Sequence, residues 1–128
     1  MKLSRVIIRV RDYRQSFEFY KNILGLKLTS SWQRKDSWGA LFSAGTAAIE
    51  IIWIPSGQGL ENCNYIPSHD KFEIDLEVND INIWHQRLKS AGAMIVDEPH
   101  DTPWGMRLFR VKDPDNIPIV LSQTTAAK

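Results

Sequence analysis

The sequence predicts an α+β fold built from two copies of one strand–helix–three-strand unit. Two observations predict it. Stretches of alternating apolar and charged residues, typical of strands, twice precede a segment with helical spacing. The signals at the helix ends also recur at a fixed offset, 68 residues from Asp12 to Asp80 and 67 from Gly25 to Gly92. Two such βαβββ modules in 128 residues predict two curved sheets around a cleft, with the helices outside.

The first module is expected to occupy residues 1–54. Its opening residues alternate between apolar and charged side chains, which predicts a strand. Asp12, with Gln15 three positions later, predicts the start of a helix, and Gly25 predicts its end. The strands expected in this module cover residues 3–10, 27–33, 37–43 and 47–54.

The second module repeats this order over residues 71–128, after a segment rich in Gly, Pro, Asn and Ser that we interpret as a linker over residues 55–70. Asp80 predicts the start of its helix and Gly92 the end. Its strands are expected over residues 72–78, 93–97, 106–111 and 117–122. We interpret residues 1–128 as a single domain of two modules.

The composition excludes several classes of protein. Apolar residues make up 43% and charged residues 24%, and the formal net charge of +1 gives no field for binding nucleic acid. No apolar run approaches the roughly 18 residues of a membrane span. Cys63 is the one cysteine, so no intrachain disulfide is possible. These features favour a cytoplasmic protein without nucleic-acid or membrane partners.

Two segments carry a resemblance to a known family. They are "RVIIRVRDYRQSFEFYKNILGLKL", which opens the first module, and "PWGMRLFRVKDPDNIPIVL", which closes the second. Together they resemble the vicinal oxygen chelate superfamily, which comprises glyoxalases, bleomycin-resistance proteins and ring-cleaving dioxygenases. The resemblance covers essentially the whole chain. It implies a site on the first and last strands of each module, where metal-dependent members place His or Glu ligands.

The family's four ligand positions fall on Arg5, Glu50, Glu73 and Val120. The resemblance implies His at the first and third of these positions and Glu at the second and fourth, so only Glu50 keeps the implied residue type. An arginine stays protonated and has no lone pair for a metal, and valine has no donor atom. We therefore expect no metal and no cofactor, and we expect Arg5 to pair with Glu50, Glu73 or both.

Strand alternation predicts which other side chains face the cleft. The predicted ligand-binding residues are those at the family positions together with tryptophans at strand ends, which stack on planar ligands, and one arginine for an anionic group. They are Arg5, Glu50, Glu73, Trp38, Trp104 and Arg107. The alternative for the charged residues is a structural ladder of cross-strand ion pairs.

The resemblance leaves several functions open. The first is a metal-independent small-molecule-binding protein, similar to the branch in which homodimers sequester an aromatic or cationic drug and confer antibiotic resistance. The second is a metal-dependent lyase, isomerase or dioxygenase of glyoxalase type. The third is a metal-free enzyme in which Glu50 or Glu73 acts as a general base. The fourth is a sensory or subunit role. The sequence leaves the ligand, any reaction, and the pairing of modules within one chain or across a dimer undecided.

Overall fold

The computed structural model describes residues 1–55 and 72–125. The chain divides into two compact units, residues 1–67 (unit 1) and 68–128 (unit 2). Apart from Pro55, the predicted linker lies outside the described residues. Each unit has the predicted order of one strand, a helical segment and further strands, so the expected α+β fold is confirmed.

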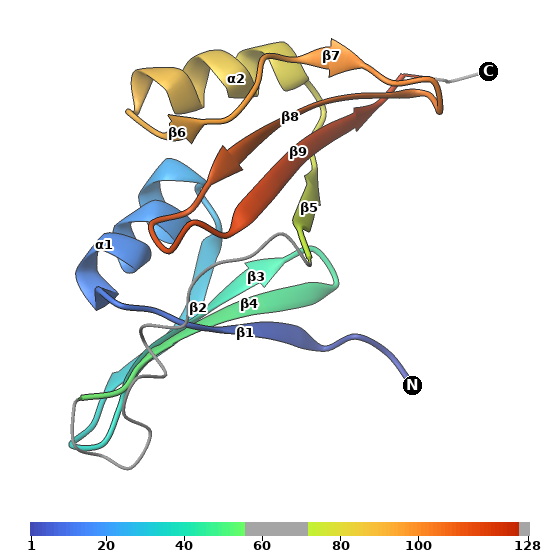
Figure 1. Ribbon diagram of the computed structural model, residues 1–128. Coiled ribbons are helices and arrows are strands. Elements are labelled where there is room, and N and C mark those ends of the chain that lie inside the picture. The colour runs from blue at the N-terminus through green and yellow to red at the C-terminus, as the bar shows by residue number, and fades with distance from the viewer. Residues whose placement is uncertain (56–71, 126–128) are drawn as a thin grey trace. The chain divides into compact units, whose positions relative to one another are not determined.

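Unit 1 is a four-stranded sheet with a helical segment on one face (Figure 1). The strand order is β1-β4-β3-β2, with β1 parallel to β4 and the other pairs antiparallel. The helix α1 packs against β3 and β4. The elements are β1 (Arg5–Arg9), α1 (Tyr13–Glu18), the π-helical segment η1 (Phe19–Ile23), β2 (Lys27–Gln33), β3 (Trp38–Ala44) and β4 (Ala47–Trp53).

Unit 2 repeats this topology with the strand order β5-β9-β8-β6, and again its first and last strands are parallel. The helix α2 packs against β8 and β9 (Figure 1). A short strand, β7, pairs with β8 and was not expected from the sequence. The elements are β5 (Ile74–Glu77), α2 (Ile81–Ser90), β6 (Met94–Ile95), β7 (His100–Asp101), β8 (Met106–Lys112) and β9 (Pro118–Thr124).

The predicted signals at the helix ends are present in both units. Asp12 Oδ1 accepts a hydrogen bond from the Gln15 backbone N–H at 3.1 Å, and Asp80 makes the equivalent bond in unit 2 at 3.3 Å. Gly25 and Gly92 adopt φ values of 77° and 79°, which suit glycine and end each helical segment.

The first helix differs from the continuous α-helix that the sequence predicts. It changes to π-helical geometry at Phe19, where the N–H of Leu24 donates to the Phe19 carbonyl at 2.8 Å. The wider turn holds Phe19, Tyr20 and Leu24 in the core, all at most 4% exposed. Core packing has therefore overridden regular helix geometry.

Each unit has its own apolar layer between helix and sheet. In unit 1 the layer includes Ile8, Val10, Tyr20, Phe42, Ile49 and Ile51, and in unit 2 it includes Ile81, Leu88, Phe109, Val111, Ile119 and Leu121. Because successive strand residues point to opposite faces, the remaining strand residues lie on the side away from the helix. We call this side the helix-free face of each sheet.

Candidate functional site

The predicted pairing of Arg5 with Glu50 is present on the helix-free face of unit 1. Arg5 lies on β1, and Glu50 on the neighbouring strand β4 pairs directly with Ile7. An Arg5 guanidinium nitrogen donates to Glu50 Oε1 at 2.7 Å. The Glu50 side chain is only 12% exposed, so its charge depends on this partner more than a surface carboxylate would.

The donor set at the family's ligand positions does not fit a divalent metal. The Arg5 cation lies on the Glu50 carboxylate, and Val120 is a buried hydrocarbon side chain. Within residues 1–55 and 72–125, no group of three or more His, Cys, Asp and Glu side chains is arranged to hold a metal ion. The permanent charge of Arg5 would repel a metal ion at these positions, and too few oxygen or nitrogen ligands are available to bind it.

Trp32, another tryptophan near a strand end, lies on the same face as Arg5. Across the sheet, Trp32 on β2 is opposite Gly39 on β3, and Ile52 on β4 connects Gly39 to Arg9 on β1. Arg9 and Arg5 are four residues apart on β1, so they point to the same face. The indole ring covers Gly39 so closely that a Cβ at this position would lie 2.1 Å from the Trp32 ring. Its Nε1 is buried and has no hydrogen-bond partner within the described residues.

On unit 2, Glu73 pairs with Arg110. The Nε of Arg110 donates to Glu73 Oε2 at 2.6 Å, and its Nη1 lies 3.6 Å from Asp97 Oδ2. The hydrogen bond to Glu73 raises the pKa of Arg110 above its usual value, so the guanidinium stays charged. Arg110 pairs directly across the ladder with Val120, so it occupies the helix-free face beside a family ligand position.

The other carboxylates on this face have neutral partners. Ser122 Oγ donates to Asp75 Oδ1 at 2.6 Å, and Thr124 Oγ1 donates to Glu77 Oε2 at 3.3 Å. Within the described residues, neither Asp75 nor Glu77 forms an ion pair. The helix-free face of unit 2 therefore keeps a net negative charge.

The remaining predicted residues lie elsewhere. Trp38 is on the helix side of its sheet. Its ring packs edge-on against Tyr13, with ring centroids 5.7 Å apart, and at a tilt against Trp53, with centroids 5.1 Å apart. Arg107 is also on the helix side, with its Nε donating to Asn82 of α2 at 3.2 Å. Trp104 lies in the turn before β8 and is 72% exposed. Trp38 and Arg107 therefore lie on the opposite side of their own sheets from the ion pair of the same unit.

Trp32 and Arg110 were detectable in part from the sequence. A glycine opposite a tryptophan on a neighbouring strand signals a ring that needs room, but the strand register must be known to see it. Arg110 alternates with the apolar Phe109 and Val111, which predicts that it points away from the helix.

Among the described residues, no helix is both long enough and apolar enough to cross a membrane.

Comparison with known proteins shows that this chain matches one family. The family model described as "Glyoxalase/Bleomycin resistance protein/Dioxygenase superfamily" matches residues 2–121. The protein YraH of Bacillus subtilis (strain 168) is 30% identical over 122 residues, which cover 91% of this chain and 93% of YraH. A probable lactoylglutathione lyase of Synechocystis is 29% identical over 140 residues, covering 100% of this chain and 99% of that protein.

Solved structures share the fold at lower identity. TnmS3, an antibiotic binding protein from Streptomyces sp. CB03234, matches with a TM-score of 0.70 and 20% identity. The match covers 97% of this chain and 96% of TnmS3. At this identity the likeness supports the fold alone.

Proposed function

The chain belongs to the glyoxalase, bleomycin resistance protein and dioxygenase superfamily, and on that premise we propose that it is a metal-independent small-molecule-binding protein. One observation carries this proposal, the 2.7 Å contact between the Arg5 guanidinium and Glu50. On the family resemblance, Arg5 falls on a metal-ligand position, and a fixed positive charge there supports binding without a metal. A binding role needs no Lewis acid, whereas glyoxalase-type chemistry uses one to stabilise an oxyanion.

The properties of the two helix-free faces support an aromatic, cationic ligand. On unit 2, Asp75 and Glu77 are exposed carboxylates that attract a cation. On unit 1, Ile7 is 51% exposed, and the ring of Trp32 offers an aromatic surface on the same face. Sequestration of a drug is the biological role that membership in a superfamily with bleomycin resistance proteins favours.

The test for metal independence uses chelator-treated protein checked by elemental analysis. Ethidium, an aromatic cation, is titrated while tryptophan fluorescence is followed, with and without added Zn²⁺, Ni²⁺ or Mn²⁺. We expect the same Kd in every case. A metal bound at one ion per chain, lost in Glu50→Gln and required for ligand binding, would overturn the proposal.

The test for ligand charge compares two neutralising substitutions in unit 2. Glu77→Gln removes a carboxylate from the helix-free face, and Glu98→Gln removes one that is 74% exposed and pairs with His85. We expect Glu77→Gln to weaken ethidium binding about three- to tenfold and Glu98→Gln to leave it unchanged. Anilinonaphthalene sulfonate, an aromatic anion, should bind more weakly than ethidium to the unsubstituted protein. Equal binding of the two dyes would argue against the ligand class.

The alternative function is an enzyme of glyoxalase type. The 29% identity with a probable lactoylglutathione lyase over its whole length favours it. It is tested by adding the hemithioacetal of methylglyoxal and glutathione, with and without Ni²⁺ or Zn²⁺. Turnover that is lost in both Glu50→Gln and Glu73→Gln would establish the enzyme and displace the binding role.

The proposal also includes a homodimer in the cytoplasm, as the resemblance to the drug-sequestering branch implies. Light scattering after size-exclusion chromatography measures the mass directly. A mass near twice the 14.7 kDa of one chain is expected.

A further inference from the structure

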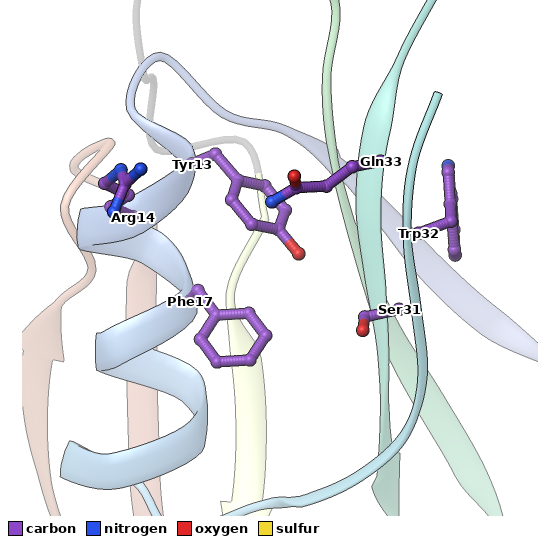
Figure 2. A pocket seen from close by; sticks show the side chains of 6 residues that line it. All are labelled: Tyr13, Arg14, Phe17, Ser31, Trp32 and Gln33. Carbon is purple, nitrogen blue, oxygen red and sulfur yellow. The ribbon is translucent and has the colours of Figure 1, made fainter. Parts of the chain in front are cut away.

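A groove on the helix side of unit 1 is not part of either helix-free face. It lies between α1 and the edge strand β2, with a volume of about 430 Å³, within the range of small-molecule sites (Figure 2). The helix and the strand each contribute three residues to its lining, namely Tyr13, Arg14, Phe17, Ser31, Trp32 and Gln33. The ring of Trp32 projects from the opposite side of the strand (Figure 2).

The groove exists because the polarity of the sheet changes at its edge. On the inner strands, the helix side carries buried residues such as Phe42 and Ile51. On β2 the helix side carries Ser31 and Gln33, which are exposed. Short polar side chains give α1 little to pack against there, so Phe17 stays half-buried with its ring facing the strand (Figure 2).

The apolar wall of the groove is held in place by other rings. Phe17 packs against Tyr13 and Phe42 with ring centroids 5.7 and 5.8 Å apart. The Tyr13 hydroxyl donates to the Gly39 carbonyl at 3.0 Å, which fixes its ring against the sheet. Burial raises the pKa of the Tyr13 phenol, so this wall carries no charge at neutral pH. A preformed aromatic wall lowers the entropic cost of binding a flat ring.

The charge of the groove is positive. Arg14 is the one charged residue in its lining, and its side chain is exposed. None of the ion pairs within the described residues involves Arg14. Ser31 and Gln33 add a hydroxyl and an amide, both hydrogen-bond donors. The Arg14 guanidinium lies on the helix side of the groove and the two neutral donors lie across it on the strand (Figure 2). A guanidinium is suited to bind a carboxylate.

We propose that this groove is a second binding site, which takes a small aromatic carboxylate with its ring against Tyr13 and Phe17 and its carboxylate toward Arg14. The site does not depend on the proposed function. The one lining residue that both use is Trp32, and its ring projects from the opposite side of β2 (Figure 2).

The experiment is an NMR titration of isotope-labelled full-length protein with phenylacetate. Acetate tests the need for the ring, and phenylacetamide tests the need for the charge. We expect phenylacetate to bind with a Kd on the order of 1 mM. The largest shifts should fall on the backbone amides of residues 13–17 and 31–33. Acetate and phenylacetamide should bind at least about threefold more weakly.

Two substitutions test the residues. Arg14→Gln keeps an exposed polar side chain on the helix, and we expect it to weaken phenylacetate binding about three- to tenfold without changing phenylacetamide binding. Lys21→Gln removes the same charge from the neighbouring η1 segment, outside the groove, and should change neither. Ser31→Leu fills the groove from the exposed strand and should weaken the binding of both compounds.

Three results would overturn the proposal. They are no shifts at about 10 mM phenylacetate, shifts centred on the helix-free face, and equal losses from Arg14→Gln and Lys21→Gln. Far-UV circular dichroism of each variant confirms that the fold is intact. Arg5→Gln provides an independent control, because it should leave phenylacetate binding unchanged even if the proposed function is wrong.

Discussion

The two units share one topology but reverse the charges on their helix-free faces. In unit 1 the first strand carries the cation, Arg5, and the fourth carries its partner, Glu50. In unit 2 the acid Glu73 stands just before the first strand, β5, at the position equivalent to Arg5. Its partner, the cation Arg110, lies on β8. Strand order therefore does not depend on which charge stands where. Alternation and helix ends set the topology, and single residues set the chemistry.

The helix sides of the units differ as well. Unit 1 has a six-residue α1 followed by a π-helical turn, and its packing is dominated by aromatic rings. Unit 2 has a regular ten-residue α2 whose buried residues are Ile81 and Leu88. Aliphatic side chains fit a regular helix closely. The groove lies in unit 1 because its edge strand β2 turns the polar residues Ser31 and Gln33 toward the helix.

The largest expected effect tests whether both cores matter equally. Phe42 and Phe109 are both 0% exposed, one in each unit. We expect Phe42→Ala and Phe109→Ala each to lower the free energy of unfolding by about 3–5 kcal/mol, because each leaves a cavity. Urea denaturation followed by circular dichroism measures it. A loss below about 1 kcal/mol in one unit alone would mean that its core is loosely packed.

The two units also differ in the residue type at the position of Gly39. The residue at its place in unit 2 is Leu108, whereas in unit 1 a side chain at 39 would meet the Trp32 ring. Gly39→Ala is expected to cost about 1–3 kcal/mol, since the ring must move. In a Trp32→Ala background the same substitution should cost less by about 1 kcal/mol or more. Equal costs in both backgrounds would show that the ring is not the obstacle.

The two helix starts should respond alike, in contrast to the cores and the faces. Asp12→Ala and Asp80→Ala each remove an N-cap acceptor, and we expect each to cost about 1 kcal/mol. Asp→Asn at either site keeps an acceptor oxygen and should restore most of the loss. Thermal denaturation of the four variants tests this. A cost at only one site would break the equivalence of the units.

Alkaline pH should distinguish the units through Tyr13, since all three tyrosines precede residue 68. Burial raises the Tyr13 pKa in the folded state above 10.0, so the unfolded state loses its proton first and stability falls above that pH. Tyr13→Phe loses the bond to Gly39, about 0.5–1.5 kcal/mol at pH 8. Its stability should then fall less steeply above pH 10 than that of the unsubstituted protein. Parallel pH profiles would contradict this.

The smallest effects concern the ion pairs themselves. The Arg5 and Arg110 side chains are 45% and 33% exposed, so water screens both pairs. Double-mutant cycles are expected to give coupling energies of at most about 1 kcal/mol, smaller at high salt. Arg110→Gln should cost slightly more than Arg5→Gln, because Arg110 also approaches Asp97. Because the hydrogen bond to Glu73 raises the pKa of Arg110 above its usual value, the arginine's contribution should be constant between pH 6 and 9 and lost only at far higher pH.

The sequence by itself determined what depends on neighbours along the chain. Helix caps, glycine ends and period-two alternation act over a few residues, so the two-module order and the ends of most elements could be predicted. Asn116 adopts φ 66°, as its tolerance of the left-handed region predicts. A pairing of Arg5 with Glu50, Glu73 or both was also predicted, because the family resemblance placed all three at ligand positions, and the pairing with Glu50 is present.

Only the tertiary structure decided which side chains meet across the sheets. Glu73 pairs with Arg110 because of the registers of β5, β9 and β8. Trp32 covers Gly39 because of the register of β2 and β3, which includes an irregularity between Leu28 and Ser30. A shift of one residue moves a side chain to the other face, so distant partners cannot be read from local patterns. The π-helical turn and the groove were also decided by the tertiary structure, since both depend on how residues distant in the sequence pack together.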